Sequence, residues 1–144
     1  MSDDATAVTM KMDKERYETE EKNILTALEQ HPEVAIAFIF GSIANRSATW
    51  ESDLDIAVQG NKPLTTEQHI ELVEDLALAT GRPIDLIDLK TAGVPLLGEI
   101  LKGKRILGSD TDHAEILKRH LFDTADFLSY GERILKERRE QWIK

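Results

Sequence analysis

The stretch FGSIANRSATWESDLDIAV, residues 40–58, decides the fold of this chain. It begins where an apolar run, VAIAFIF at residues 34–40, ends, and such a run is typical of a buried strand. Gly41 permits a sharp backbone turn, and Ser42 is a residue type that caps short helices. Backbone N–H groups exposed at such a turn bind anions, so the pattern favours a phosphate there.

A pair of carboxylates opens the second apolar run, DLDIAV at residues 53–58. Side chains alternate between the faces of a strand, so Asp53 and Asp55 should point the same way, about 7 Å apart. Two like charges repel unless a positive ion lies between them. Mg2+ bound by one or two carboxylates and substrate phosphates is the usual form of such a site. The stretch therefore predicts phosphoryl or nucleotidyl transfer.

A third carboxylate comes from residues 82–89, RPIDLIDL, which predict a short strand. Asp85 and Asp88 are three positions apart, so they cannot share one face of a regular strand. Asp85 lies mid-run between apolar residues, where an ionised group is costly unless it is paired or bound to a metal. Asp88 lies at the end, as a helix cap or a solvated group. We therefore favour Asp85 as the third metal ligand.

Composition indicates one globular domain in the cytoplasm. The chain has 144 residues, 41% of them apolar, and lacks an apolar run of the roughly eighteen residues that span a membrane. The acidic N-terminus does not resemble a secretory signal, and the absence of cysteine excludes disulfides and thiolate metal sites. A formal charge of −9 disfavours direct binding of RNA or DNA, because nucleic-acid-binding proteins usually carry a basic patch.

Periodicity and capping signals divide the chain into three parts. Residues 1–12 are polar, acidic and without periodicity, which indicates disorder. Residues 13–110 form the core, and residues 111–144 form a C-terminal helix. Capping residues are expected at Asp13, at the Thr65–Gln68 capping box and at Gly81. The expected elements are helices at 14–30, 65–80, 94–102 and 111–144 and strands at 34–40, 53–58, 83–88 and 105–107.

The last predicted helix, capped by Asp110 or Asp112, is apolar on more than one side. It should pack on the core and also contact a partner; alternatively, one sheet face absorbs all of it. Its apolar residues are Ile116, Leu117, Leu121, Phe122, Ala125, Phe127, Leu128, Tyr130, Ile134 and Leu135, with Gly131 as a possible bend.

Other residue types carry weaker signals. The four histidines, at 31, 69, 113 and 120, lack metal-ligand spacing and fall on predicted surfaces. Trp50, inside the decisive stretch, could stack on a base or pack its loop.

Gly-Ser, ten residues and then Asp-x-Asp resembles the signature of the polymerase-β-like nucleotidyltransferase superfamily, and Ser52 completes its Ser-Asp-x-Asp form. The stretch GRPIDLIDL at 81–89 resembles the minimal nucleotidyltransferase (MNT) branch, and the likeness covers roughly residues 20–108. It implies an α/β (α+β) fold, with a small mixed sheet flanked by helices and a long C-terminal helix.

The resemblance also implies roles for residues. Gly41 and Ser42, with Ser52, would bind the nucleotide triphosphate; Asp53 and Asp55 would hold two Mg2+ ions; Asp85 would be the third ligand and help to activate the attacking hydroxyl. The family often reads Ala-Arg-Gly after Gly-Ser. This chain has Ala44-Asn45-Arg46, so its basic residue is shifted by one and the glycine is missing.

The MNT branch typically works with a separate helical protein, a HEPN toxin. The resemblance implies an antitoxin that transfers AMP from ATP to a tyrosine of such a toxin. The toxin's own pattern, Arg, four to six residues and His, is absent here. The alternatives are an antitoxin that acts by contact alone, a small-molecule nucleotidyltransferase of the aminoglycoside-modifying kind, and a regulatory nucleotide-binding module.

Overall fold

The computed structural model describes residues 12–143. Side chains are described throughout this range except at 126–131 and 140–143. The disorder expected for residues 1–12 therefore lies outside the description, except at Met12, which is buried. The elements in chain order are α2 (Lys14–Glu29), β1 (Ile36–Phe40), α3 (Gly41–Ala44), β2 (Leu54–Gln59), α4 (Thr66–Thr80), β3 (Ile84–Asp88), α5 (Val94–Leu101), β4 (Lys104–Leu107) and α6 (Asp110–Ile143).

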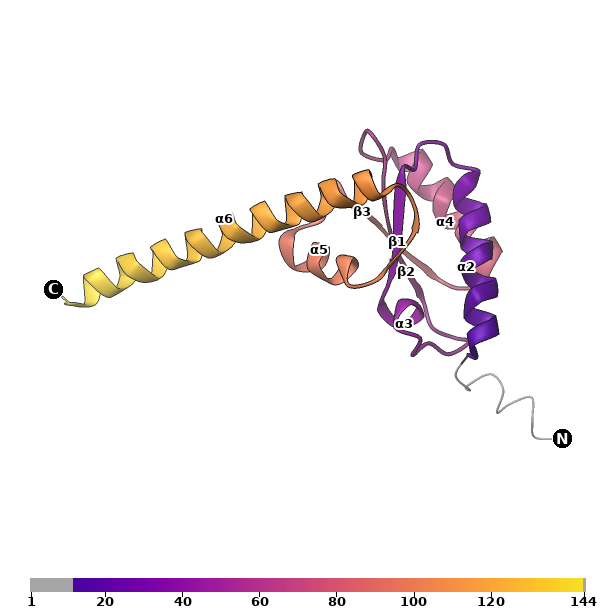
Figure 1. Cartoon of the computed structure of the whole chain (residues 1–144), viewed down its shortest axis with the longest axis horizontal. Helices are drawn as coiled ribbons and strands as arrows, with labels where there is room; N and C mark the ends of the chain where they lie inside the picture. Colours follow the sequence, from indigo (N-terminus) through magenta and orange to yellow (C-terminus); the bar gives the residue numbers. More distant parts are fainter. Residues whose placement is uncertain (1–11, 144) are drawn as a thin grey trace.

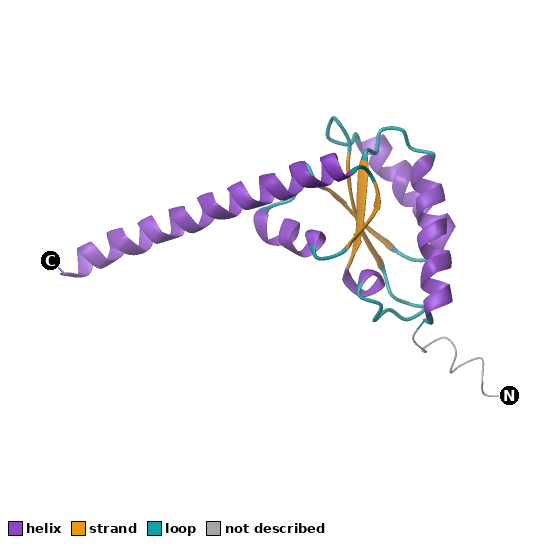
Figure 2. Ribbon diagram, in the orientation of Figure 1, coloured by secondary structure: helices purple, strands orange, loops and turns teal. Residues whose placement is uncertain are grey.

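The four strands form one mixed sheet in the order β3-β2-β1-β4 (Figure 2). The central strand β1 runs antiparallel to both β2 and β4, whereas β2 and β3 are parallel. The parallel pair needs a crossover, and α4 supplies it. The sheet thus has the mixed architecture that the family resemblance implied.

Helices cover both faces of the sheet (Figure 1). On one face, α2 and α4 pack over alternate strand residues such as Ala37, Ile39 and Ile56. On the other face, α5 and the first turns of α6 pack over Ile36 and Phe38. Because β1 is apolar at every position, it can be buried on both sides, as the run at 34–40 predicted.

Most helix ends follow the local signals. Asp13 accepts from the Arg16 N–H at 2.9 Å, the predicted capping box at Thr65 and Gln68 is present, and Gly81 is left-handed at φ 68°. The helix expected at 111–144 is present, but its predicted cap was wrong, because the Asp112 N–H donates to Ser109 Oγ at 3.1 Å and the helix already starts at Asp110. Ser42 does not cap α3 either, since the helix begins at Gly41 and has no side-chain cap hydrogen bond.

The long helix α6 leaves the domain after its first turns (Figure 1). Ile116 is buried in the core beneath α5, whereas Leu117, Leu121, Phe122 and Leu135 are exposed. One sheet face therefore does not absorb the whole apolar surface. The predictions for Phe127, Leu128, Tyr130 and Gly131 lie outside the described side chains. Throughout residues 12–143, every helix is too short or too polar to cross a bilayer.

One predicted surface residue is instead buried. His31 is only 7% exposed, with Nε2 at 2.6 Å from Asp75 Oδ2 and Nδ1 at 3.1 Å from Glu33 Oε1. The contact joins the end of α2 to α4. Sequence alone misplaced His31 because its main partner, Asp75, lies 44 positions away.

Candidate active site

Two of the predicted carboxylates are direct neighbours in the sheet. In the parallel register, Asp55 of β2 is the partner of Asp85 of β3. Leu54 and Ile56 belong to the core beneath α2 and α4, so Asp55 points to the opposite face. Asp85 is exposed rather than enclosed by its apolar neighbours, because β3 is an edge strand. The fold thus brings two acidic groups, 30 positions apart in sequence, to one place.

The charge of this pair is unfavourable as it stands. Burial raises the pKa of Asp55, the charge of Asp85 and a hydrogen bond with it raise the pKa further, and the charge of Asp53 adds a smaller effect. Asp53 precedes β2 and is exposed. Among the side chains that the structure describes, no three of Asp, Glu, His or Cys lie close enough together to hold one metal ion. The structure therefore pairs Asp55 with Asp85, and Asp53 acts on Asp55 through charge.

Gly41 is required where it stands. Its φ is +68°, and a Cβ added there would lie 2.2 Å from Asp55 Oδ2. A side chain there would displace the Asp55 carboxylate, and the left-handed backbone is also unfavourable for residues other than glycine. The backbone at the start of α3 therefore contacts the Asp55 carboxylate directly, which places the Gly-Ser turn against the acidic pair.

A cavity of about 220 Å³ lies beside this turn. One wall comes from α3 and its end, and the other from the end of α5. Lys102 provides the positive charge in the lining, with Nζ 3.1 Å from Glu99 Oε1 on the exposed surface. The lining residues are Gly41, Ala44, Asn45, Glu99, Lys102 and Gly103. The cavity therefore has a lysine and a glycine backbone in its lining, and that glycine, Gly41, also lies against the Asp55 carboxylate.

Three other residues of the stretch at 40–58 make contacts with neighbouring protein groups. The Arg46 guanidinium lies over the Tyr17 ring, 5.3 Å from its centroid. The Arg16 guanidinium lies over the Trp50 ring, with Cζ 4.1 Å from the centroid, and the ring is 40% exposed. The Ser52 hydroxyl accepts from the Thr49 N–H at 2.9 Å.

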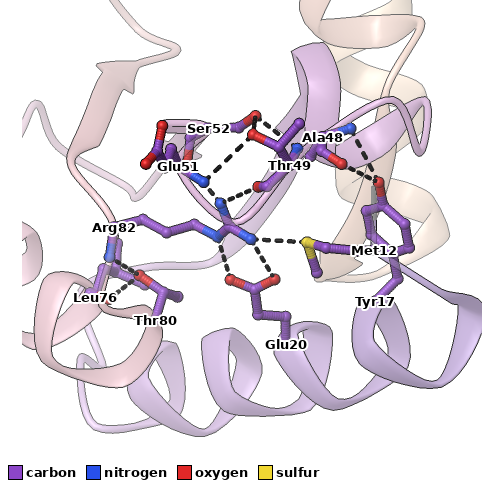
Figure 3. Close-up of polar contacts among 10 residues, drawn as sticks. All are labelled: Met12, Tyr17, Glu20, Ala48, Thr49, Glu51, Ser52, Leu76, Thr80 and Arg82. Atoms are coloured by element: carbon purple, nitrogen blue, oxygen red, sulfur yellow. Dashed lines mark hydrogen bonds and ion pairs between the residues drawn. The ribbon is translucent and has the colours of Figure 1, made fainter. Parts of the chain in front are cut away.

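Sequence reasoning missed the residue that anchors the loop, Arg82 (Figure 3). Its guanidinium is buried, pairs with buried Glu20 of α2, and donates to the carbonyls of Thr49 and Ser52 at 2.8 and 2.7 Å. Tyr17 adds a second anchor, because its hydroxyl accepts from the Ala48 N–H and donates to the Ala48 carbonyl. The loop before Asp53 is therefore held by α2 and by the residue that precedes β3.

One sequence signal could have revealed this anchor. Glu20 lies at the helical spacing of the buried residues Tyr17, Ile24 and Leu28 of α2. A carboxylate on the buried face of a helix needs a cation or donors within reach. The pattern thus predicts a buried partner for Glu20, although it does not identify Arg82.

The donor set suits a divalent cation. Mg2+ takes oxygen ligands, often one or two carboxylates together with substrate phosphates. Asp55 and Asp85 are paired carboxylates that repel each other, and burial together with the charge of Asp85 raises the pKa of Asp55. A bound cation would remove it, and the adjoining turn and cavity offer N–H groups and Lys102 to an anion. Chemically, the site can bind a metal–polyphosphate complex.

Comparison with known proteins agrees with this geometry. The family described as polymerase beta nucleotidyltransferase matches residues 22–112. The chain is 31% identical over 94 residues to the protein adenylyltransferase MntA of Shewanella oneidensis. These residues make up 65% of this chain and 68% of that protein.

Two solved structures have the same fold. A crystal structure of a toxin-antitoxin with AMP-PNP contains a chain with a TM-score of 0.71 at 24% identity, over 81% of this chain and 96% of that one. A structure of tri-AMPylated Shewanella oneidensis HEPN toxin in complex with MNT antitoxin gives a TM-score of 0.68 at 23% identity, over 84% and 97%. With its paired aspartates beside a glycine turn, the chain belongs to the polymerase beta nucleotidyltransferase family.

Proposed function

We propose that this chain is a cytoplasmic antitoxin that transfers AMP from ATP to a tyrosine of a cognate HEPN toxin and so neutralises it. The proposal rests first on one observation: Asp55 and Asp85 are register partners, and the Asp55 carboxylate lies against the Gly41 backbone. The similarity to the protein adenylyltransferase MntA, and to complexes that contain AMP-PNP or an AMPylated toxin, supports protein as the acceptor class.

The proposed chemistry is a direct displacement at phosphorus. The tyrosine oxygen attacks the α-phosphorus of ATP, an O–P bond forms, the α–β anhydride bond breaks and pyrophosphate leaves. Two bound Mg2+ ions would supply a lowered hydroxyl pKa and charge stabilisation of the leaving group.

Each site residue has a proposed part. Asp53 and Asp55 would hold the two ions, and their positive charge would draw Asp53 toward the Asp55–Asp85 pair. Asp85, exposed on the edge strand, is open to the acceptor hydroxyl and would help to take its proton.

The phosphates would bind at the α3 turn. Gly41 and Ser42 would present N–H groups to them, and Ser52 stays in the predicted nucleotide-binding set. Arg46, shifted by one position from the family's arginine, lies over the Tyr17 ring, so we assign it no phosphate contact. Lys102, in the lining of the adjoining cavity, supplies a positive charge on the other wall.

The partner would contact α6. Leu121 and Phe122 of α6 are 68% and 61% exposed, and this helix extends beyond the sheet (Figure 1). Adjacent exposed apolar side chains of this size commonly mark protein-binding surfaces. An acidic chain with formal charge −9 also suits a partner with a basic, RNA-cleaving surface.

The test uses labelled ATP with Mg2+, this chain and a candidate toxin, which is a HEPN protein that co-purifies with it. Wild type should label a tyrosine of that protein, and Asp55→Asn should abolish labelling while the protein stays folded, because it loses a metal ligand. A matched control is Asp88→Asn, since Asp88 binds the Leu64 and Lys90 N–H groups at the far end of β3.

The same assay separates the alternatives. A stable complex without label would indicate an antitoxin that acts by contact alone. Label on an aminoglycoside instead of the protein would indicate a small-molecule transferase. Asp55→Asn that still labels the toxin at a near-normal rate would contradict the assignment of the site.

A further inference from the structure

The buried guanidinium of Arg82 uses every one of its hydrogen-bond donors (Figure 3). Nε and Nη2 bind the two carboxylate oxygens of Glu20, and Nη2 also contacts Met12 Sδ. Both hydrogens of Nη1 go to backbone carbonyls, those of Thr49 at 2.8 Å and Ser52 at 2.7 Å. Arginine has five N–H donors in a fixed fork, whereas lysine has three on a single nitrogen, so lysine cannot reproduce this set.

The place of Arg82 in the chain gives these contacts a consequence. Ser52, whose carbonyl it binds, directly precedes Asp53, and Arg82 itself lies three residues before Asp85. One rigid group therefore ties the segment that leads into the first carboxylate to the segment that leads into the last. Glu20 fixes the fork from α2, a third part of the chain.

We infer that Arg82 is a positioning residue, which sets Asp53 relative to the Asp55–Asp85 pair by holding the loop at 49–52. The part of this inference that concerns kcat for AMP transfer rests on the function proposed above. Arg82 would touch neither substrate nor metal and would act through the loop.

If the ion pair served only stability, a variant that regains its Tm would also regain wild-type loop exchange, Mn2+ affinity and kcat. A buried Arg–Glu pair can often be replaced by apolar side chains with little loss of stability, whereas removing one member leaves a buried unpaired charge. Arg82→Met should therefore lower Tm, and Glu20→Met/Arg82→Met should recover most of that loss. The double variant still lacks donors for the Thr49 and Ser52 carbonyls, so the loop should stay loose.

Amide exchange, Mn2+ affinity and the kinetics of AMP transfer distinguish a positioning role from a purely structural one. In the double variant, amide exchange at residues 49–53 should rise about tenfold or more, because the loop opens locally. Mn2+ affinity, and kcat for AMP transfer, should fall by about 10–100-fold, as for other groups that orient metal ligands. KM for ATP should change little, because the phosphates bind at the Gly41 turn. Arg82→Lys should keep the charge pair but lower kcat.

The control is Lys14→Gln/Glu18→Gln, which removes an exposed ion pair from the same helix and should leave all three measurements unchanged. A double variant that regains wild-type exchange, Mn2+ affinity and kcat along with its Tm would overturn the inference. If wild type transfers no AMP but the double variant loses Mn2+ affinity and loop protection, the inference stands and the proposed function fails.

Discussion

At the residue scale, the site combines an acidic group that is costly to ionise with a left-handed glycine whose backbone lies against that group. Asp55 is half-buried beside Asp85, and both burial and like charge disfavour its ionised form. Gly41 lets the backbone approach that carboxylate to a distance where a Cβ would overlap Oδ2. The fold gives up stability at this point, as is usual where a charged ligand is to be bound.

The raised pKa of Asp55 predicts a pH-dependent loss of stability. The folded state holds this proton more tightly than the unfolded chain, so the free energy of unfolding falls as pH rises from about 3.9 through the raised pKa. Asp55→Asn cannot ionise and should escape the loss. Its Tm advantage over wild type should be present at neutral pH and shrink in acid, measured by thermal unfolding across a pH series.

An equal Tm difference at neutral and acidic pH would contradict this account. Asp88→Asn is the comparison, because the Asp88 carboxylate accepts two backbone N–H bonds and should bring no stability gain when neutralised.

A glycine pair separates backbone strain from steric overlap. Gly41 and Gly81 both have φ +68°, but an added Cβ meets Asp55 Oδ2 at 2.2 Å in the first and no atom within 4 Å in the second. Gly81→Ala should cost about 1 kcal/mol from left-handed strain alone. Gly41→Ala should cost more and also displace the Asp55 carboxylate, so Mn2+ binding and AMP transfer should fall only in that variant.

Denaturant unfolding and Mn2+ titration of the two variants decide the question. Equal losses of stability, with metal binding intact in both, would mean that the contact between Gly41 and Asp55 is not important.

At the element scale, each strand end has a distinct task. The starts of β2 and β3 carry the acidic pair, while the end of β3 carries Asp88, which ties down the loop before α4. The helices are similarly divided: α2 and α4 bury their faces against the sheet, whereas α6 does so only in its first turns. Beyond those turns, the described side chains of Leu121, Phe122 and Leu135 are exposed.

The exposed face of α6 predicts a binding defect without a folding defect. Leu121→Asp should weaken the complex with the toxin by about tenfold or more, because a charge would replace an apolar contact. Tm should stay near wild type, since Leu121 is 68% exposed. Leu78→Asp, which alters a leucine 86% exposed on α4, is the matched control. Calorimetric titration measures the toxin affinity of both variants. Equal affinities would exclude α6 as the contact.

At the scale of the whole molecule, charge and shape favour a partner larger than a metabolite. The sequence carries 27 acidic and 18 basic residues, and the domain extends a helix well beyond its own core. Such a surface attracts a basic protein over distances of about a Debye length and repels nucleic acid.

This charge predicts a salt-dependent association rate. The rate constant for binding the toxin should fall by about tenfold or more from low to high ionic strength, because screening removes electrostatic steering. The dissociation rate should change less, since apolar contacts along α6 would hold the complex. Stopped-flow association across a salt series measures both; an association rate independent of salt would rule out steering by charge.

The sequence by itself determined the local structure and the identity of the acidic residues. The caps at Asp13, Thr65 and Gly81, and the strands at residues 34–40, 53–58 and 83–88, depend on neighbours a few positions away, so periodicity and capping rules predicted them to within two residues. The α6 cap was missed because Ser109, Asp110 and Asp112 offer three competing oxygens within four residues.

Only the tertiary structure decided which distant residues meet. Parallel pairing of β2 with β3 brings Asp55 to Asp85, and the sheet edge exposes Asp85, although its sequence neighbours are apolar. The Arg82–Glu20 contact spans 62 positions, so no local pattern contains both of its members. Residues far apart in sequence are brought together by packing of the whole chain, and that packing set the geometry of this site.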